Sequence, residues 1–454
     1  MSKPNIFFLT IDSLRADKLF GSSKTSVTPN LDSIIENATY FTQAISSADQ
    51  TGTSLASIFT AQFPITTGLT HFNFSTKTET YFDIFKQNGY YTCGFFPDHE
   101  FFKNLTTNFD EKTLYVYDKI ENWKNLYGGI GDSILKKINL LDNHEPWIFP
   151  VHIMDLHNPS ALPKKFDESK YGENIYERML SSIDFWIGQF YKNLDSKNTL
   201  FVITSDHGAY IPLKQIPSEI PSIQNFMKKG KDTAPFLEPI GIKLFLLLRN
   251  LAKKYRTQKL KKELSDIELR SFNVRGNNEL FEETIRVPLL FTGLDISGSK
   301  IINDLVRHVD IFPTISELTN VNAVDTRTDG RSLVPLFTDQ KMDELPAYIE
   351  TGVTASQFND KVNPKSTGKI IGLRTSKYKY LKSRDSHENL RILFDLLDDP
   401  METENIYEIK SNIAFDLDKK LSKLMNKPKK QFTSDLSDDE QQKAEDLLKK
   451  LGYV

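Results

Sequence analysis

The sequence predicts an α/β protein with a large, mostly parallel sheet flanked by helices and a small antiparallel subdomain at the C-terminal end. Short apolar runs of strand length alternate along the chain with amphipathic runs of helical spacing. This alternation is typical of buried parallel strands joined by crossover helices. With 454 residues, of which 39% are hydrophobic and 26% charged, the chain can bury a large core and lacks the composition of a disordered protein.

Five apolar runs indicate buried strands, and three amphipathic runs indicate helices. The predicted strands cover residues 6–11, 92–96, 147–153, 199–204 and 287–291. The predicted helices cover residues 33–37, 80–88 and 175–194. In such sheets ligands collect at the carboxyl ends of the strands. The residues that follow the strands are therefore the first candidates for a functional site.

Residues 209–274 interrupt this alternation and are predicted to form an insertion between two core strands. They hold two prolines within residues 216–221 and a long helix-like run over residues 241–268. We expect this insertion, at about 209–274, to belong to a first domain over residues 1–345.

The chain beyond residue 345 has shorter strand signals, at residues 369–373 and 378–382. Apolar residues at helical spacing then predict a helical tail over residues 438–451. We therefore expect a second domain over residues 346–454, a small antiparallel subdomain with a helical tail.

Charge, cysteine content and hydropathy indicate which binding partners and which cellular location to expect. The chain has 57 basic and 60 acidic residues, and its net charge of −3 does not indicate a nucleic-acid partner. Its one cysteine, Cys93, excludes an intramolecular disulfide and a cysteine-based zinc cluster, which suits a reducing compartment. The apolar runs at residues 6–11 and 240–248 are too short for a signal peptide or a membrane span. The predicted location is the cytoplasm.

Polar side chains that can bind a metal or attack an ester follow the predicted strands. Asp12 ends the first strand, Asp155 and His157 follow the third, and Asp206 and His207 follow the fourth. Carboxylate and imidazole groups gathered at one edge of a sheet predict a metal site.

Hydroxyl groups at the start of a predicted helix, in the segment from Thr51 to Pro64, are a second feature with chemical meaning. The free N–H groups and positive dipole end of a helix bind an anionic phosphoryl or sulfuryl group, so a hydroxyl there is well placed as a nucleophile.

Together these segments resemble the sulfatase family of the alkaline phosphatase superfamily. Later segments in the same order also resemble it, at residues 280–290, 308–314, 330–333, 372–380, 394–405 and 451–454. The resemblance implies an alkaline-phosphatase-like sandwich with a mixed sheet flanked by helices. It also implies a divalent cation and a nucleophile that attacks a sulfate or phosphate ester.

The resemblance assigns metal ligands to this sequence. Asp12, Asp206 and His207 match the family's ligands, whereas Ser13 stands where most members have a second Asp. With Thr51, these residues form a four-ligand set that suits one ion of zinc or manganese better than calcium, with magnesium also open. A strand-end cap or a structural hydrogen bond is the alternative interpretation of each residue taken alone.

The nucleophile position departs from the family pattern. Members that cleave sulfate esters have Cys or Ser, oxidised to formylglycine, at the start of a Cys/Ser-x-Pro-x-Arg signature, and the matching positions here are Thr51, Thr53 and Leu55. Threonine cannot become formylglycine, but it is the nucleophile in superfamily relatives that act on phosphate esters. We therefore predict a phospho-threonine intermediate on Thr51. An N-cap of the following helix is the alternative, and the register within residues 49–54 is open.

Four further residues are candidates through the resemblance. His157 matches the histidine that contacts the transferred group or protonates the leaving oxygen, whereas a core role is the better interpretation of His152. Asn277 aligns with a family Lys or His, and Arg275 is a candidate for the missing cation. His308 is a substrate-binding candidate, with a packing role as the alternative.

Residues 243–262 hold eight basic residues and no acidic ones, beside leucines at helical spacing. This pattern predicts peripheral contact of residues 241–264 with an anionic membrane, on the inner membrane face. A solvated helix packed on the domain is the alternative.

The predicted function is metal-dependent hydrolysis or transfer of a phosphate-type ester through Thr51, on an anionic substrate that a lipid or polysaccharide could carry. Two alternatives stay open. One is hydrolysis of a sulfuric ester without formylglycine. The other is a catalytically inactive binding protein, which the missing Asp, Arg and Lys of the family pattern would fit.

Overall fold

The computed structural model of the chain describes residues 3–70, 74–116, 125–157, 159–211, 270, 280–294, 296, 299–321, 328–351, 370–384 and 390–426. The chain divides into two compact units, Met1–Ala209 with Gly276–Val454, and Tyr210–Arg275. Of the second unit, residues 210, 211 and 270 are described. The elements below belong to the first unit.

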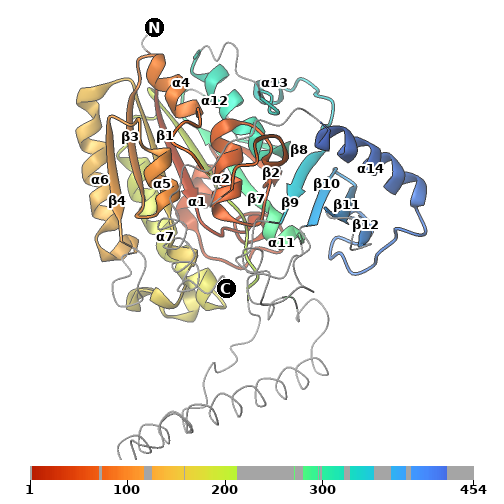
Figure 1. Cartoon of the computed structure of the whole chain (residues 1–454). Helices are drawn as coiled ribbons and strands as arrows, with labels where there is room; N and C mark the ends of the chain where they lie inside the picture. Colours follow the sequence, from red (N-terminus) through yellow and green to blue (C-terminus); the bar gives the residue numbers. More distant parts are fainter. Residues whose placement is uncertain are drawn as a thin grey trace, which may run out of the picture. The chain divides into compact units, whose positions relative to one another are not determined.

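The first unit is built on an eight-stranded sheet with the order β4-β3-β5-β1-β6-β7-β2-β8 (Figure 1). The strands are β1 (Asn5–Ile11), β2 (Thr39–Ile45), β3 (Tyr91–Pro97), β4 (Glu111–Tyr115), β5 (Trp147–Ile153), β6 (Thr199–Thr204), β7 (Arg286–Thr292) and β8 (Lys300–Arg307). All neighbours pair in parallel except β7, which is antiparallel to both β6 and β2. The predicted large, mostly parallel sheet is confirmed.

The described helices of this unit connect and cover the strands. They are α1 (Pro29–Ile35), α2 (Thr51–Thr60), α3 (Pro64–Thr67), α4 (Tyr81–Gln87), α5 (Glu100–Leu105), α6 (Ile130–Leu141), α7 (Ile175–Lys192), α11 (Glu282–Ile285), α12 (Ile311–Leu318), α13 (Val334–Phe337) and α14 (Ser411–Met425). The helix predicted over residues 33–37 begins earlier, because Pro29 occupies the first helical turn, where proline is well tolerated. None of the described helices is both long and apolar enough to cross a membrane.

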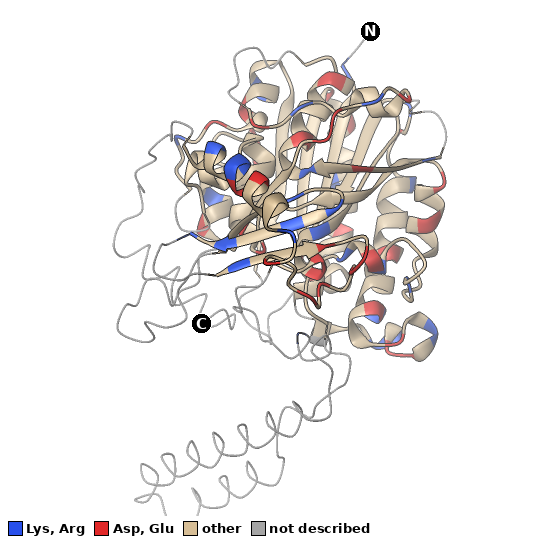
Figure 2. Cartoon of the chain, turned by 90° about the vertical axis from the view of Figure 1, so that its right-hand side faces the viewer, with Lys and Arg blue, Asp and Glu red and all other residues tan. Residues whose placement is uncertain are grey.

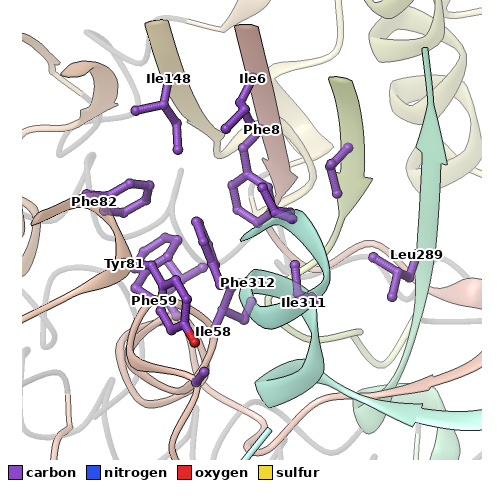
Figure 3. Close-up of a cluster of buried hydrophobic side chains, with 14 of the residues drawn as sticks. Ile6, Phe8, Ile58, Phe59, Tyr81, Phe82, Ile148, Leu289, Ile311 and Phe312 are labelled. Carbon is purple, nitrogen blue, oxygen red and sulfur yellow. The ribbon is translucent and has the colours of Figure 1, made fainter. Parts of the chain in front are cut away.

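Aromatic side chains of β1 point alternately to the two faces of the sheet and so fix the helices on each. Phe8 packs on Phe59 of α2 and Phe312 of α12, with ring centroids 6.2 and 5.2 Å away (Figure 3). Phe7 faces the other side and packs on Phe190 of α7 at 6.1 Å. Each fully buried phenylalanine stabilises the fold by about 1.5–3 kcal/mol. The core thus anchors α2, whose first residue is Thr51, beside the end of β1.

Cys93 lies in β3, between the neighbouring strands β4 and β5, and its side chain is buried. Burial raises the pKa of its thiol to about 12. The single cysteine is therefore part of the packed core, as its apolar neighbours in the sequence suggest.

A separate sheet of four antiparallel strands follows the large one. Its order is β12-β11-β10-β9, with β9 (Ala347–Glu350), β10 (Ile370–Arg374), β11 (Tyr378–Ser383) and β12 (Arg391–Asp395). Helix α14 packs on it through Leu417 and Leu421. The predicted antiparallel subdomain is confirmed, whereas the helical tail predicted over residues 438–451 lies outside the described residues.

Candidate active site

The ends of β1 and β6 bring three predicted metal ligands together. The two strands are parallel neighbours with Thr10 opposite Thr204, so Asp12 leaves β1 close to where Asp206 and His207 follow β6. One ligand atom from each of Asp12, Asp206 and His207 lies within 4.8 Å of the others, and all three residues are buried. The geometry meets the expectation for these three strand-end residues, whereas Asp155, after β5, is not among the clustered ligands and accepts a hydrogen bond from the N–H of Leu126 at 3.0 Å.

Thr51 is the first residue of α2, and its hydroxyl faces this cluster. Its Oγ1 donates a hydrogen bond to Asp12 Oδ2 at 3.0 Å and lies 3.3 Å from His207 Nε2. The N-cap of α2 is Gln50, which makes no side-chain capping bond. The alternative interpretation of Thr51 as an N-cap is therefore wrong, because its hydroxyl contacts the cluster from inside the first helical turn.

His157, which follows β5, also contacts Asp12. Its Nδ1 lies 3.1 Å from Asp12 Oδ1. Because a carboxylate can only accept a hydrogen bond, Nδ1 is the protonated nitrogen in this contact. His157 therefore lies at the predicted site. It contacts Asp12 directly, and Asp12 in turn contacts Thr51.

His152, inside β5, has the surroundings of a core histidine. Its Nδ1 lies 2.8 Å from Thr10 Oγ1, and its Nε2 lies 3.9 Å from Asp12 Oδ2. Burial lowers the pKa of its imidazole to about 4, so the ring is neutral at pH 7. The core interpretation of His152 fits this environment.

Ser13, which stands out in the sequence only as the position of the missing Asp, takes part in the site. Its backbone is left-handed, with φ of 63°. In this conformation its N–H donates to Asp206 Oδ1 at 3.1 Å, and its hydroxyl donates to Asp12 Oδ1 at 2.5 Å. Tyr176 of α7 holds the turn by donating to the Ser13 carbonyl at 2.7 Å. Serine here bridges the two carboxylates that a second Asp would repel.

His308 is buried behind α2. Its Nδ1 lies 3.0 Å from Ser54 Oγ, and Ser54 Oγ lies 2.5 Å from the carbonyl of Asp206. Burial lowers the pKa of His308 to about 3, which keeps the ring neutral. These contacts match the packing alternative for His308 and not a group that reaches out to a substrate. Ser54 thus links His308 to the backbone of Asp206. In the sequence, Ser54 stood out only as one of the residues 49–54 among which the position of the nucleophile was open.

Electrostatics favour a cation at the cluster. Burial alone would raise the pKa of Asp12, but the imidazoles of His157, His207 and His152 hold this pKa well below its usual range. Burial raises the pKa of Asp206 to about 6. Two adjacent buried carboxylates repel each other unless a positive charge lies between them.

Asp206 also offers an oxygen that fits a metal ligand. Its Oδ1 accepts hydrogen bonds from the N–H groups of Ser13 and His207. Its Oδ2 is buried and has no hydrogen-bond partner within the described part of the chain. A buried acceptor without a donor is costly, and the oxygen and nitrogen atoms of the cluster suit a divalent ion. The residues present therefore fit the predicted metal.

Two predicted site residues cannot be placed. Arg275 and Asn277 lie outside the described residues, as do most of the predicted insertion at 209–274 and the basic segment 241–264.

The chain matches two protein-family models and several known proteins. A model described as Sulfatase matches residues 4–321, and one described as N-sulphoglucosamine sulphohydrolase, C-terminal, matches residues 272–431. Arylsulfatase K of Canis lupus familiaris is 31% identical over 156 residues, which are 33% of this chain and 28% of that relative. The similarity thus spans less than a third of the length of this relative.

Two other matches extend over most of the chain. The ulvan-active sulfatase of Formosa agariphila is 22% identical over 514 residues, covering 100% of this chain and 85% of that relative. The crystal structure of the phosphonate monoester hydrolase of Agrobacterium radiobacter superposes with a TM-score of 0.69 over 96% of this chain and 99% of that one, at 13% identity. The structural likeness concerns the fold.

Proposed function

The chain belongs to the sulfatase family of the alkaline phosphatase superfamily, and on this premise we propose that it is a metal-dependent hydrolase or transferase that cleaves a phosphate-type ester with Thr51 as its nucleophile. One observation carries the proposal: Thr51 Oγ1 lies 3.0 Å from Asp12 Oδ2 and 3.3 Å from His207 Nε2, at the start of α2. Asp12 and His207 hold and polarise the Thr51 hydroxyl, which favours its attack on an ester.

Asp12, Asp206, His207 and Thr51 are the residues that would hold the metal. When bound, a divalent cation lowers the pKa of a coordinated hydroxyl and offsets the negative charge of the ester. The mixed oxygen and nitrogen donors favour zinc or manganese, and Ser13 in place of a carboxylate leaves few oxygens for calcium.

The chain's own groups supply orientation and proton transfer. Thr51 Oγ1 passes its proton to Asp12 Oδ2, its hydrogen-bond acceptor, and bonds to phosphorus while the bond from phosphorus to the leaving oxygen breaks. The first-turn N–H groups of α2 bind the phosphoryl oxygens, since they have no partner within the helix. Nδ1 of His157 keeps its proton toward Asp12 Oδ1, and Nε2 of the doubly protonated ring gives its proton to the leaving oxygen, which leaves the ring neutral. Water or an acceptor alcohol then releases the phosphate group from Thr51.

The substrate class follows from the nucleophile. Threonine cannot supply the formylglycine hydrate from which sulfatases eliminate sulfate, whereas an alkoxide attacks phosphorus directly. The relatives named as sulfatases support an anionic ester, including one on a polysaccharide, and the phosphonate monoester hydrolase shares the fold. We therefore propose phosphodiester or phosphonate monoester chemistry, with sulfate-ester hydrolysis as the second candidate that the sulfatase relatives favour.

The test combines a substrate panel with variants of α2. Metal-reconstituted wild type is assayed on aryl phosphate, phosphodiester, phosphonate and sulfate, beside Thr51→Ala, Thr51→Ser and the control Thr53→Ala. Thr53 is a buried threonine of the same helical turn, so its replacement also tests the register. Loss of the nucleophile is expected to lower kcat at least about 1,000-fold, whereas Thr51→Ser retains part of the activity and Thr53→Ala nearly all.

Acid quenching during turnover, followed by peptide mass spectrometry, is expected to find the phosphoryl group on Thr51. Wild-type rates in Thr51→Ala would overturn the nucleophile, and efficient turnover of aryl sulfate with none of the phosphorus esters would establish the second candidate. No turnover or metal binding by any form would support the inactive binding protein.

A further inference from the structure

Four charged side chains, of which Arg374, Lys379 and Glu402 are buried and Glu282 is half-buried, form an ion network that the proposed reaction does not use. Lys379 of β11 is fully buried and contacts Glu402 Oε1 at 2.6 Å and Glu282 Oε1 at 2.9 Å. Arg374 of β10 contacts Glu282 Oε2 at 3.0 Å. Figure 2 shows such basic residues in blue on the strands of the four-stranded sheet. The network consists of two basic and two acidic side chains.

Several contacts of this network lead to the start of α11. The N–H of Glu282, the first residue of α11, donates to Glu402 Oε2 at 2.7 Å. Lys379 Nζ also donates to the carbonyl of Leu280 at 2.9 Å. Glu402 holds its position with a left-handed backbone, φ of 56°, which is strained for a residue with a side chain. The four-stranded sheet thus fixes the start of α11 through side chains from β10, β11 and the turn after β12.

Helix α11 in turn holds two loops of the active site through its backbone. The carbonyl of Thr284 accepts from Gly208 N at 2.8 Å, and the carbonyl of Ile285 accepts from Ser46 N at 2.7 Å. Gly208 follows His207, and its approach is so close that a Cβ there would lie 2.0 Å from the carbonyl of Glu283. The position of α11 therefore determines where the backbone beside His207 lies.

We propose that Glu282, Arg374, Lys379 and Glu402 are positioning residues for the active site. Their network determines the position of α11, and α11 determines the position of the Gly208 backbone. The imidazole of His207 is thereby held where it can contact the metal and Thr51. This inference rests on the proposed function, because it concerns His207 as a metal ligand. A partner of this kind, beyond the direct ligands, typically changes metal affinity or activity about 10–100-fold when it is lost.

The test is a double variant that keeps the buried charge balanced. Lys379→Met with Glu402→Gln removes one cation and one anion and leaves the Arg374 and Glu282 pair intact, which avoids an uncompensated buried charge. The matched control is Lys382→Met with Asp418→Asn. Lys382 lies on the same strand and contacts Asp418 of α14 at 2.7 Å, and among the described residues the hydrogen bonds of this pair join β11 to α14 and not to α11.

Both double variants are compared with wild type at a temperature well below their measured thermal unfolding midpoints. Affinity for Zn²⁺ and Mn²⁺ is measured by competition with a chelator, and kcat and KM are measured on the best substrate of the panel. We expect the affinity of the Lys379 and Glu402 variant for the metal to fall about 10-fold or more. We also expect its kcat to fall by a larger factor than its KM changes. The control is expected to stay within about twofold of wild type, like other changes away from the site.

The outcomes separate this inference from the proposed function. Wild-type metal affinity and kcat in the folded Lys379 and Glu402 variant, or equal losses in the control, would overturn the positioning role and leave the function of Thr51 untouched. Should this variant fail to fold, Glu402→Gln alone, which keeps the shape of the side chain, is measured in the same way. A wild type that binds no metal contradicts the proposed function itself.

Discussion

The side chain of Asp12 contacts three other residues of the site. Its carboxylate accepts from Ser13 Oγ, Thr51 Oγ1 and, at His157, a ring nitrogen, over distances of 2.5, 3.0 and 3.1 Å. Both of its oxygens are thus oriented by protein groups. Asp206 differs, since only its Oδ1 accepts hydrogen bonds from described residues. We infer that Asp12 couples the nucleophile to the acid, and that Asp206 serves mainly the cation.

Replacement of Asp206 by alanine is therefore expected to lower the affinity for a divalent ion by more than about 100-fold, beyond the loss typical of an outer partner. Elemental analysis of the purified protein and chelator competition measure it. Asp184→Asn is the control, because Asp184 is also buried but accepts from Asn30 and Leu31 at the start of α1. If Asp206→Ala keeps the wild-type metal content and activity, the site is misassigned.

The hydrophobic pattern predicted Asp12, His157, Asp206 and His207 at strand ends, and the resemblance to the sulfatase family implied that Thr51 joins them. It did not predict the role of Ser13. The left-handed Ser13 is stabilised by Asp206, which follows β6, and by Tyr176 of α7, both far away in the chain, so no local sequence pattern predicts these contacts. The burial of His308 against Ser54 depends in the same way on the packing of α2.

At the scale of elements, the sequence predicted the positions of several strands but not the direction of every strand. Residues 287–291 form a strand as predicted, but β7 runs antiparallel to its neighbours. The reason is α11, whose Thr284 carbonyl binds Gly208 just beyond the end of β6, so the chain enters β7 from that same end. Strands β2, β4 and β8 were not predicted, because polar residues interrupt their apolar pattern, and β4 and β8 are the edges of the sheet.

The first turn of α7 supplies a prediction about pH. Glu177 is buried and accepts from Lys18 Nζ at 2.7 Å and Thr25 Oγ1 at 2.6 Å. Burial raises the pKa of its carboxyl, but the bonds from Lys18 and Thr25 outweigh this and hold the pKa below its usual 4.5. The folded state therefore binds this proton more weakly than the unfolded state does. The stabilisation is complete above the unfolded pKa and is lost as the pH falls through the folded one.

Glu177→Gln is accordingly expected to lower the free energy of unfolding by about 1–2 kcal/mol at pH 7, and the difference from wild type is expected to shrink below about pH 4.5. Urea denaturation over a pH series measures it. Glu168→Gln, which removes the partner of Lys170 in an exposed ion pair, should change little at any pH. A constant difference for Glu177→Gln down to acid pH would contradict the assigned cause.

At the scale of the whole molecule, the two sheets meet next to the nucleophile. The N–H of Glu350, in β9, donates to the carbonyl of Ser47 at 3.0 Å, a few residues before Thr51. The small sheet is therefore part of the support of the active site as well as an appendage to the core. The sequence predicted both sheets but not this contact, because strand patterns carry no information on which loops a distant strand will touch.

Charge along the whole chain gives the last prediction. A chain of net charge −3 concentrates eight basic residues over 243–262, outside the described residues. Near an anionic membrane each contributes about 1 kcal/mol at most, and salt screens the attraction. We expect sedimentation with anionic liposomes at low salt, weaker at high salt and weaker still after Lys253, Lys254, Lys261 and Lys262 are changed to Glu. Equal sedimentation of that variant would exclude docking through this segment.

The buried thiol of Cys93 has a practical consequence for following motion in solution. Maleimide and methanethiosulfonate reagents attack thiolates, and a shielded thiol with a pKa of about 12 offers almost none at neutral pH. The natural chain thus serves as a background without a reactive thiol. A cysteine introduced at Phe415, whose side chain is exposed on α14, can carry a fluorophore alone, and a second at an exposed site on the large sheet would allow spectroscopic rulers to report on the small sheet during turnover.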